Sequence, residues 1–324
     1  MEKELEESQH LLREQLTELD HIYSTAPVGL CFMDTNLRFL RVNQRLAAIN
    51  GKSVSEHIGR TLKDIIPSLT SSIEPIYRQV IESGEPILNF EIHGITPGEP
   101  EMPRHWLLSY HPLRSDEGTV QGVSTVVQDI TELKEAEAEL KWELELDAAL
   151  SELYKPLISP YSSIEDMANI ILELAMRMTD SGNGYVSSID PITGDNVAHT
   201  LTEMMGDQCK VPSEHERIAF PRGDDGAYHG LWGYCLNNLE PFFTNSAGTH
   251  QASTGVPQGH IPIERFLSVP VTLSGELVGR ISLANKKNNY NERDVEAIRR
   301  LAEFYALAIQ RTRAERALQQ AHDE

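Results

Sequence analysis

An uninterrupted helical pattern between Asp129 and Tyr154 constrains this chain more than any other feature of its sequence. This stretch contains no Gly or Pro, and apolar residues recur at steps of three and four with Glu and Lys in most of the gaps. One stripe holds Leu133, Ala136, Leu140, Leu144 and Ala148, and a second holds Leu146, Leu150 and Leu153. Thr131 is suited to cap the helix, because its hydroxyl can accept a hydrogen bond from a free N–H group of the first turn. The sequence therefore predicts a stiff helix over residues 131–154.

Mixed strand and helix patterns lie on both sides of this helix. At 324 residues the chain is long enough for two domains, each with its own core. A stiff helix between two domains can transmit a shift or a twist, and it can pair with a second copy of itself through Leu133 and Leu140. An inert spacer helix is the alternative that the pattern leaves open.

The net charge of −21 argues against partners that are themselves polyanions. A phosphate backbone or an anionic membrane surface would repel this chain, so we expect neither nucleic-acid nor membrane binding. No apolar run approaches the roughly 20 residues of a transmembrane helix, and the first residues are acidic and polar rather than signal-like. The three cysteines, Cys31, Cys209 and Cys235, have no metal-type spacing and no even count for a disulfide framework. These features predict a cytoplasmic protein.

The first 130 residues predict a helix followed by a small mixed domain. Residues 1–22 have Leu5, Leu12 and Leu19 at intervals of seven, which is a short coiled-coil-like pattern. Two strands follow around the turn Asp34–Asn36, and then a cluster of short helices that ends with residues 72–82. Three further strands are predicted at residues 87–92, 104–113 and 120–128.

This order of elements and four of its motifs resemble the PAS sensor domain over residues 23–132. The motifs are Ala26–Leu30, Arg41–Arg45, Ile58–Pro67 and Val127–Thr131. The resemblance implies that Asp129 and Thr131 tie the final strand to the outgoing helix. It also implies a pocket that holds haem, flavin, a small acid or nothing.

Four side chains bear on the occupant of this first pocket. The reactive cysteine of flavin photosensors is absent, and Cys31 on its apolar strand is expected to be a small buried side chain. His93, His105 and His111 alternate with apolar residues and are expected to face solvent, with a haem ligand among them as the alternative.

The second half predicts another domain, which begins inside the long helix. Residues 164–178 have helical periodicity, and Ser163 with Asp166 forms a capping box before them. Strands are predicted at residues 184–190 and 197–202, and a hairpin over residues 266–284 turns at Ser274–Gly275. A last helix begins after Asn291.

This half resembles the GAF domain over residues 147–310. The motifs are Gly230–Gly233, Glu240–Asn245, Phe266–Val271, Gly275–Gly279 and Ser282–Lys286. The resemblance brings in three ligands besides an empty pocket. A bilin chromophore would need an anchoring cysteine next to a histidine or in a comparable setting, and neither Cys209 nor Cys235 fits. A cyclic nucleotide could use the Asn285–Lys286 motif together with Asp294, although an ion pair from Lys286 to Asp294 that pins the last helix to the hairpin explains the same residues. Haem could use Cys209, Cys235, His250 or His260, which fall in the segment that covers the pocket of this fold.

The chain carries no phosphate loop, metal cluster or Ser-His-Asp signature, and residues 311–324 are only a helical tail, so we expect no enzyme activity. The resemblances predict an α+β protein with two tandem sensor domains, PAS then GAF, each an antiparallel sheet with flanking helices, joined by a long signalling helix. The expected function is cytoplasmic signal input of the two-component type. The expected partners are a second copy of the chain, a histidine kinase or response regulator, and an unknown small molecule. A haem-based redox sensor or enzyme and a cyclic-nucleotide regulator are the alternatives.

Overall fold

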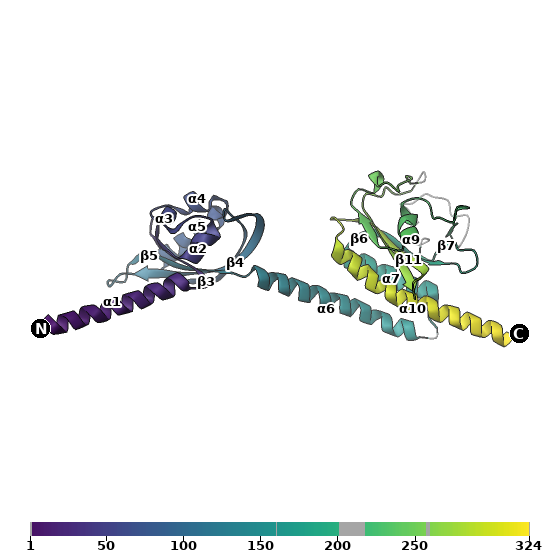
Figure 1. Ribbon diagram of the computed structural model, residues 1–324, viewed down its shortest axis with the longest axis horizontal. Coiled ribbons are helices and arrows are strands. Elements are labelled where there is room, and N and C mark those ends of the chain that lie inside the picture. Colours follow the sequence, from purple (N-terminus) through teal and green to yellow (C-terminus); the bar gives the residue numbers. More distant parts are fainter. Residues whose placement is uncertain (1, 160, 201–217, 257–259, 324) are drawn as a thin grey trace. The chain divides into compact units, whose positions relative to one another are not determined.

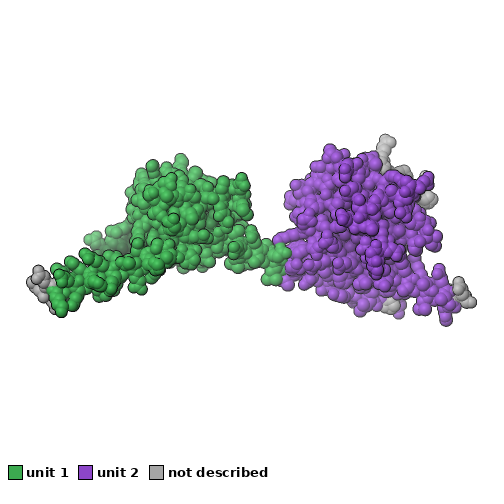
Figure 2. Space-filling model, in the orientation of Figure 1, with its two compact units in different colours: residues 1–140 green, residues 141–324 purple. Residues whose placement is uncertain are grey.

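The computed structural model describes residues 2–159, 161–200, 218–256 and 260–323. It divides into two compact units, residues 1–140 and 141–324, which Figure 2 colours separately. Helix α6 (Thr131–Ile158) begins in the first unit and ends in the second. Within the described ranges, no helix combines the length and apolarity that a membrane crossing requires.

The first unit is an antiparallel sheet of five strands with helices α2–α5 over one face (Figure 1). The strands lie in the order β2-β1-β5-β4-β3. They are β1 (Gly29–Asp34), β2 (Phe39–Val42), β3 (Ile87–Thr96), β4 (Glu99–Arg114) and β5 (Val120–Asp129). The helices are α1 (Glu2–Thr25), α2 (Gln44–Asn50), α3 (Val54–His57), α4 (Leu62–Ile65) and α5 (Pro67–Ser83). Apolar side chains of α2, α4 and α5 pack on the sheet and form one core.

Asn43 explains why the chain turns from β2 into α2. Its Oδ1 accepts hydrogen bonds from the N–H groups of Leu46 at 3.0 Å and Leu30 at 2.9 Å, so one side chain caps the helix and holds β1. Gly51 ends α2 with φ = +69°, and a Cβ there would lie 2.6 Å from the backbone of Gly98. A glycine is needed at this position both for the left-handed backbone and for the close approach.

The second unit is an antiparallel sheet of six strands in the order β8-β7-β6-β11-β10-β9. The strands are β6 (Ser181–Ile189), β7 (Asn196–Ala198), β8 (Ile218–Phe220), β9 (Phe242–Thr244), β10 (Phe266–Leu273) and β11 (Glu276–Lys286). One face packs against α7 (Ile164–Thr179), α10 (Glu292–Asp323) and the end of α6. The other face carries η1 (Leu231–Gly233), α9 (Tyr234–Asn238) and a second, smaller core around Tyr228 and Cys235. The short η2 (Ala247–Thr249) precedes β10. The predicted capping box from Ser163 to Asp166 opens α7.

Several elements extend beyond their predicted bounds. Helix α6 continues past residue 154 to Ile158 and includes Pro156 in its last turn, and α1 continues past residue 22 to Thr25. Helix α5 begins at Pro67 rather than at residue 72, because proline is well suited to the first turn of a helix. The predicted tail over residues 311–324 is no separate element, since α10 runs without a break to Asp323. These differences lengthen helices and leave the order of elements unchanged.

Candidate functional site

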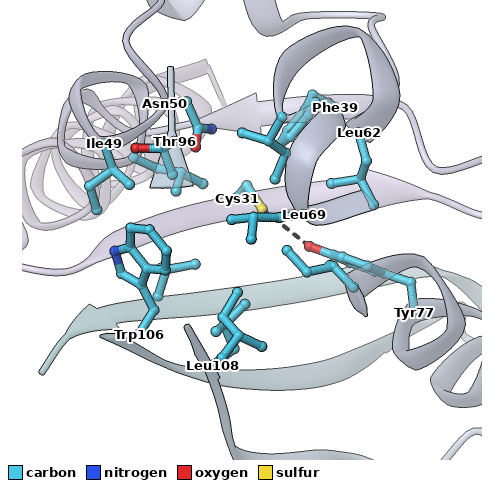
Figure 3. A pocket seen from close by; sticks show the side chains of 15 residues that line it. Cys31, Phe39, Ile49, Asn50, Leu62, Leu69, Tyr77, Thr96, Trp106 and Leu108 are labelled. Atoms are coloured by element: carbon cyan, nitrogen blue, oxygen red, sulfur yellow. Dashed lines mark hydrogen bonds between the residues drawn. The ribbon is translucent and has the colours of Figure 1, made fainter. Parts of the chain in front are cut away.

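The first unit encloses a small apolar cavity between its sheet and its helices. The volume is about 40 Å³. One water molecule needs roughly 10–15 Å³ measured in this way, so the cavity has room for a very small molecule and little more. Figure 3 shows the side chains that line it, among them Cys31, Asn50, Tyr77, Thr96 and Trp106.

The sulfur of Cys31 faces a buried chain of hydroxyl groups at this cavity (Figure 3). Its Sγ lies 3.7 Å from the hydroxyl of Tyr77, which lies 2.7 Å from Oγ1 of Thr125. Burial raises the pKa of the Cys31 thiol to about 11. The thiol is therefore neutral at pH 7 and behaves as a small buried side chain, as its position on an apolar strand predicts.

Asn50 lines the same cavity, and its side chain contacts the buried imidazole of His57. Nδ1 of His57 lies 2.7 Å from the carbonyl oxygen of Ser53, which can only accept, so this nitrogen carries the proton. Nε2 then accepts from Nδ2 of Asn50 at 3.0 Å. Burial lowers the pKa of His57, which keeps the imidazole neutral. The amide oxygen of Asn50 is thereby left as an acceptor at the cavity wall.

Asp129 and Thr131 join the last strands of this unit to the first turn of α6. Oδ1 of Asp129 accepts from the N–H group of Thr131 at 3.0 Å, and Oδ2 accepts from Nη1 of Arg104 at 3.0 Å. The hydroxyl of Thr131 accepts from the N–H group of His105 at 3.0 Å, and the carbonyl of His105 accepts from Ile130 N at 2.9 Å. The helix cap is therefore Asp129 rather than the predicted Thr131. Asp129 accepts a hydrogen bond from the first N–H group of the helix, whereas the Thr131 hydroxyl accepts one from His105 of β4.

The charge of Asp129 is maintained by this junction. Burial alone would raise the pKa of the carboxyl group, but the hydrogen bonds from Thr131 and the nearby guanidinium of Arg104 outweigh it, so the pKa lies below its ordinary value. Arg104 is also paired with Glu99. Lys134, one turn into α6, reaches Glu91 of β3 at 3.0 Å. Side chains of three strands therefore hold the start of the helix.

The two apolar stripes of α6 have different surroundings. Leu133, Leu140 and Leu144 are 56%, 63% and 61% exposed. Leu146 and Leu153 are fully buried, and Leu153 lies in the main core of the second unit. Helix α1 likewise exposes Leu5, Leu12 and Leu19 at 56–63%. Leucines at these spacings and exposures give each helix an apolar stripe that belongs to none of the cores formed by the described residues.

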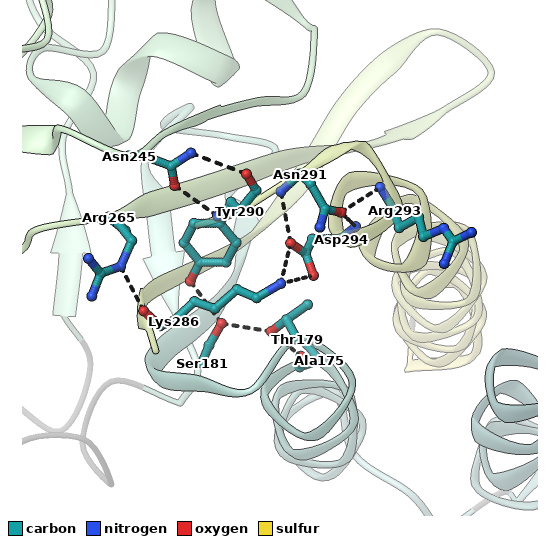
Figure 4. Close-up of polar contacts among 10 residues, drawn as sticks. All are labelled: Ala175, Thr179, Ser181, Asn245, Arg265, Lys286, Tyr290, Asn291, Arg293 and Asp294. Atoms are coloured by element: carbon teal, nitrogen blue, oxygen red, sulfur yellow. Dashed lines mark hydrogen bonds and ion pairs between the residues drawn. The ribbon is translucent and has the colours of Figure 1, made fainter. Parts of the chain in front are cut away.

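Lys286 and Asp294 form a nearly buried ion pair between β11 and α10 (Figure 4). Nζ of Lys286 lies 2.8 Å from Oδ1 and 2.6 Å from Oδ2 of Asp294. Oδ2 also accepts from the N–H group of Asn291 at 2.9 Å, which caps α10. Tyr290 between them bonds through its hydroxyl to Ser181 at 2.8 Å. Each of these polar groups is thus engaged with another part of the domain.

Of the residues proposed for haem, the three that the structure describes each have another contact. Cys209 lies outside the described residues. Cys235 is buried on α9, where its Sγ lies 2.9 Å from the hydroxyl of Ser268, and burial raises its pKa to about 12. His250 packs edge-on against Tyr234 with ring centroids 5.1 Å apart, and Nδ1 of His260 bonds to the carbonyl of Ile261. A neutral, hydrogen-bonded thiol is a poor iron ligand in this conformation.

Arg104 and Trp106 are examples of residues that sequence reasoning missed in the first unit. Arg104, the partner of Asp129, opens a predicted strand and had no distinguishing pattern. Trp106, two residues later, is 2% exposed, and its Nε1 has no partner among the described residues. Strand alternation could have placed Trp106 on the buried face with Leu108, but not its contact with a cavity.

Comparison with known proteins matches each unit to a family. Residues 23–135 match the PAS fold and residues 162–310 match the GAF domain. A curated protein that is 27% identical over 301 residues is the methyl sulfide methyltransferase-associated sensor of Methanosarcina acetivorans. The match covers 92% of this chain and 28% of that protein, so the chain spans little more than a quarter of this relative.

Two solved structures are also similar to parts of this chain. VqmA of Vibrio cholerae, in a complex with a ligand and DNA, is 24% identical with a TM-score of 0.32, covering 36% of this chain and 51% of VqmA. The GAF domain of a phosphoenolpyruvate-protein phosphotransferase from Coxiella burnetii is 19% identical with a TM-score of 0.43, covering 55% of this chain and 98% of that domain. Because the two family matches follow one another and each falls within one folded unit, the chain carries a PAS domain followed by a GAF domain.

Proposed function

We propose that this chain is the signal-input part of a two-component system, and that a small molecule in the PAS cavity changes how α6 is held. The observation that carries the proposal is the junction of Arg104, Asp129 and Thr131, which ties the strands behind the cavity to the first turn of α6. Trp106 connects the two places, because it lines the cavity and pairs with Asp129 across β4 and β5. A ligand that favours one arrangement of these strands shifts the population of helix geometries.

The cavity wall favours a small apolar molecule with a hydrogen-bond acceptor. Most of the lining side chains are aliphatic or aromatic. The indole N–H of Trp106 is buried without a partner among the described residues, and leaving such a donor unpaired costs about 1–3 kcal/mol. A carbonyl or ring nitrogen of the ligand would satisfy it, and a ligand donor could bond the amide oxygen of Asn50.

The apolar stripes of α1 and α6 support a homodimer. Seven-residue spacing with more than half of each leucine exposed is the pattern of a helix that pairs with a copy of itself. Paired α6 helices would carry a change at the junction to a histidine kinase or response regulator, located with this chain in the cytoplasm. The name of the Methanosarcina acetivorans relative, a sensor, agrees with this class of function.

A cavity-filling substitution can stand in for the unidentified ligand. Leu62 lines the cavity from α4, on the helical layer and away from the junction. We expect Leu62→Phe to alter hydrogen-exchange protection over residues 131–140 in the full chain, because the larger ring displaces the strands behind the cavity. The same change made together with Asp129→Ala should have a smaller effect, since the junction that carries the shift is broken.

Leu40→Phe is the matched control, because Leu40 of β2 is 52% exposed and does not line the cavity. It should leave protection over residues 131–140 as in the unsubstituted protein. If Leu62→Phe changes exchange within the PAS core but leaves residues 131–140 untouched, the cavity does not act on α6 and the proposal is wrong.

A further inference from the structure

A fully buried arginine lies in the middle of the GAF sheet. Arg280 is 0% exposed and sits on β11, paired with Ser187 of β6 on one side and Pro270 of β10 on the other. Its neighbour Ile281 lies in the core that α7 and α10 cover. Because side chains alternate along a strand, Arg280 points to the opposite face, where η1 and α9 lie.

Aromatic rings rather than acids surround this guanidinium. Its Cζ lies 4.5 Å from the ring centroid of Tyr185 and 5.4 Å from that of Trp232, and Trp232 is itself 5.1 Å from Phe220. Nη1 donates to the carbonyl oxygen of Trp232. Among the residues that the structure describes, no carboxylate lies within ion-pair distance of Arg280. Cation–π contacts with Tyr185 and Trp232 offset only a small part of the hydration that a buried charge loses.

Two of the three nitrogens of Arg280 lack a hydrogen-bond partner among the described residues. Nε and Nη2 are buried and make no hydrogen bond in the described parts of the chain, and the hydroxyl of Tyr185 is in the same state. Burial pushes the pKa of Arg280 well below its ordinary value. A guanidinium nevertheless keeps its proton in proteins, so the charge remains and requires an anion.

We propose that Arg280 anchors a binding site for a small organic anion on this face of the GAF sheet. Nε and Nη2 form the edge of the guanidinium that presents two parallel N–H groups, and a carboxylate accepts both in a bidentate pair. Nη1 is already held by Trp232, which fixes that edge in place. The half-buried rings of Tyr185 and Trp232 favour an apolar or planar remainder on the ligand. A phosphate group offers the same pair of oxygens and is the other source of this chemistry.

Three probe compounds, benzoate, benzamide and inorganic phosphate, distinguish a carboxylate ligand from a phosphate ligand. Benzamide has the shape of benzoate without its charge. We expect benzoate to raise the melting temperature of the full chain by about 5–10 °C at a hundred times its dissociation constant, measured at constant ionic strength, and benzamide to leave it unchanged. A shift with phosphate and none with benzoate would assign the site to phosphate esters. No shift with either anion overturns the proposal.

Substitutions at Arg280 distinguish a ligand anchor from a structural residue. Arg280→Met removes the charge and keeps much of the stem, and such replacements of buried charges are often neutral or stabilising. We expect the Arg280→Met protein to melt at or above the temperature of the unsubstituted protein, and its melting temperature to be unaffected by benzoate. Arg280→Lys keeps the charge but not the fork, so benzoate should bind at least about tenfold more weakly. Arg299→Met, an exposed change on α10, should respond to benzoate as the unsubstituted protein does.

An Arg280→Met protein that melts much lower and still responds to benzoate would show that Arg280 serves only the fold. This inference does not depend on the PAS cavity or on the junction with α6. Its failure would leave the proposed relay untouched, and the reverse also holds.

Discussion

Breaking the Lys286–Asp294 ion pair tests whether these residues serve the GAF fold rather than a bound nucleotide. The side chains of Lys286 and Asp294 are 14% and 7% exposed, and Asp294 has two contacts to lose. Its Oδ2 lies 2.6 Å from Nζ of Lys286 and 2.9 Å from the backbone nitrogen of Asn291. Lys286→Met removes only the first contact. Asp294→Asn removes the charge but keeps an oxygen for Asn291.

The magnitude follows from the burial of the pair. Removing one partner of a fully buried pair costs about 3–5 kcal/mol because a charge is left uncompensated, whereas an exposed pair contributes about 0.2–1 kcal/mol. The slight exposure of Lys286 and Asp294 places the loss from each single substitution just below the buried range, at about 2–3 kcal/mol. The double variant leaves no unpaired charge, so its loss should fall short of the sum by about 1–3 kcal/mol.

Denaturant unfolding of the GAF transition measures this coupling energy. The exposed pair of Lys287 and Asp180, 3.2 Å apart with side chains 79% and 61% exposed, is the matched control in the same unit. The corresponding cycle there should show coupling under about 0.5 kcal/mol. Additive losses at Lys286 and Asp294 would refute the structural reading. So would a rise in melting temperature with cyclic AMP or cyclic GMP that Lys286→Met abolishes.

Two further predictions concern α6. Light scattering should show a dimer that Leu140→Glu weakens, because a charge replaces a leucine of the apolar stripe. Leu88→Glu, at an exposed position of β3, should leave the dimer unchanged. A monomeric unsubstituted protein at micromolar concentration would contradict dimerisation through α6. Asp129→Ala should raise hydrogen exchange over residues 131–140 and lose about 1 kcal/mol per hydrogen bond, whereas Asp129→Asn should keep the bond to Thr131 N and lose less. Because the pKa of Asp129 is lower in the folded state than in the unfolded state, its contribution is present above about pH 4 and is lost as the pH falls through the folded pKa. Asp129→Asn should remove that part of the acid sensitivity, and an unchanged acid profile would contradict it.

The sequence was sufficient for the order of elements because periodicity is a local property. Strand alternation and helical spacing place the five strands of the PAS sheet, and the same patterns place the long GAF hairpin. Element ends were less predictable, since α5 uses Pro67 as a first-turn residue inside what reads as a loop. Sequence spacing of eight residues also placed Lys286 and Asp294 at neighbouring element ends, where a pair can form.

The candidate sites were harder to predict because they depend on contacts between distant residues. Arg104 and Asp129 are 25 positions apart, and no local pattern connects them. Arg280 follows three apolar or small residues on a predicted strand. A charged residue in such a run indicates a buried charge that needs a partner. The sequence does not show that the guanidinium has no carboxylate partner among the described residues, because this depends on the positions of Tyr185, Trp232 and their neighbours.

The geometry of α6 explains why an exposed stripe and a buried stripe can serve one signal. At about 100° per residue, Leu140 and Leu144 lie within about 40° of one another, while Leu146 and Leu153 lie on the opposite face. The first pair is exposed, and the second pair is buried. A rotation of the helix at the Asp129 junction would therefore move both faces together, changing the seam offered to a second copy and the packing under the GAF sheet. A flexible linker would lose such a rotation, because each peptide could absorb it separately. In the proposed relay, the stiffness of the uninterrupted helix is what lets a change at the Asp129 junction act on the rest of the chain.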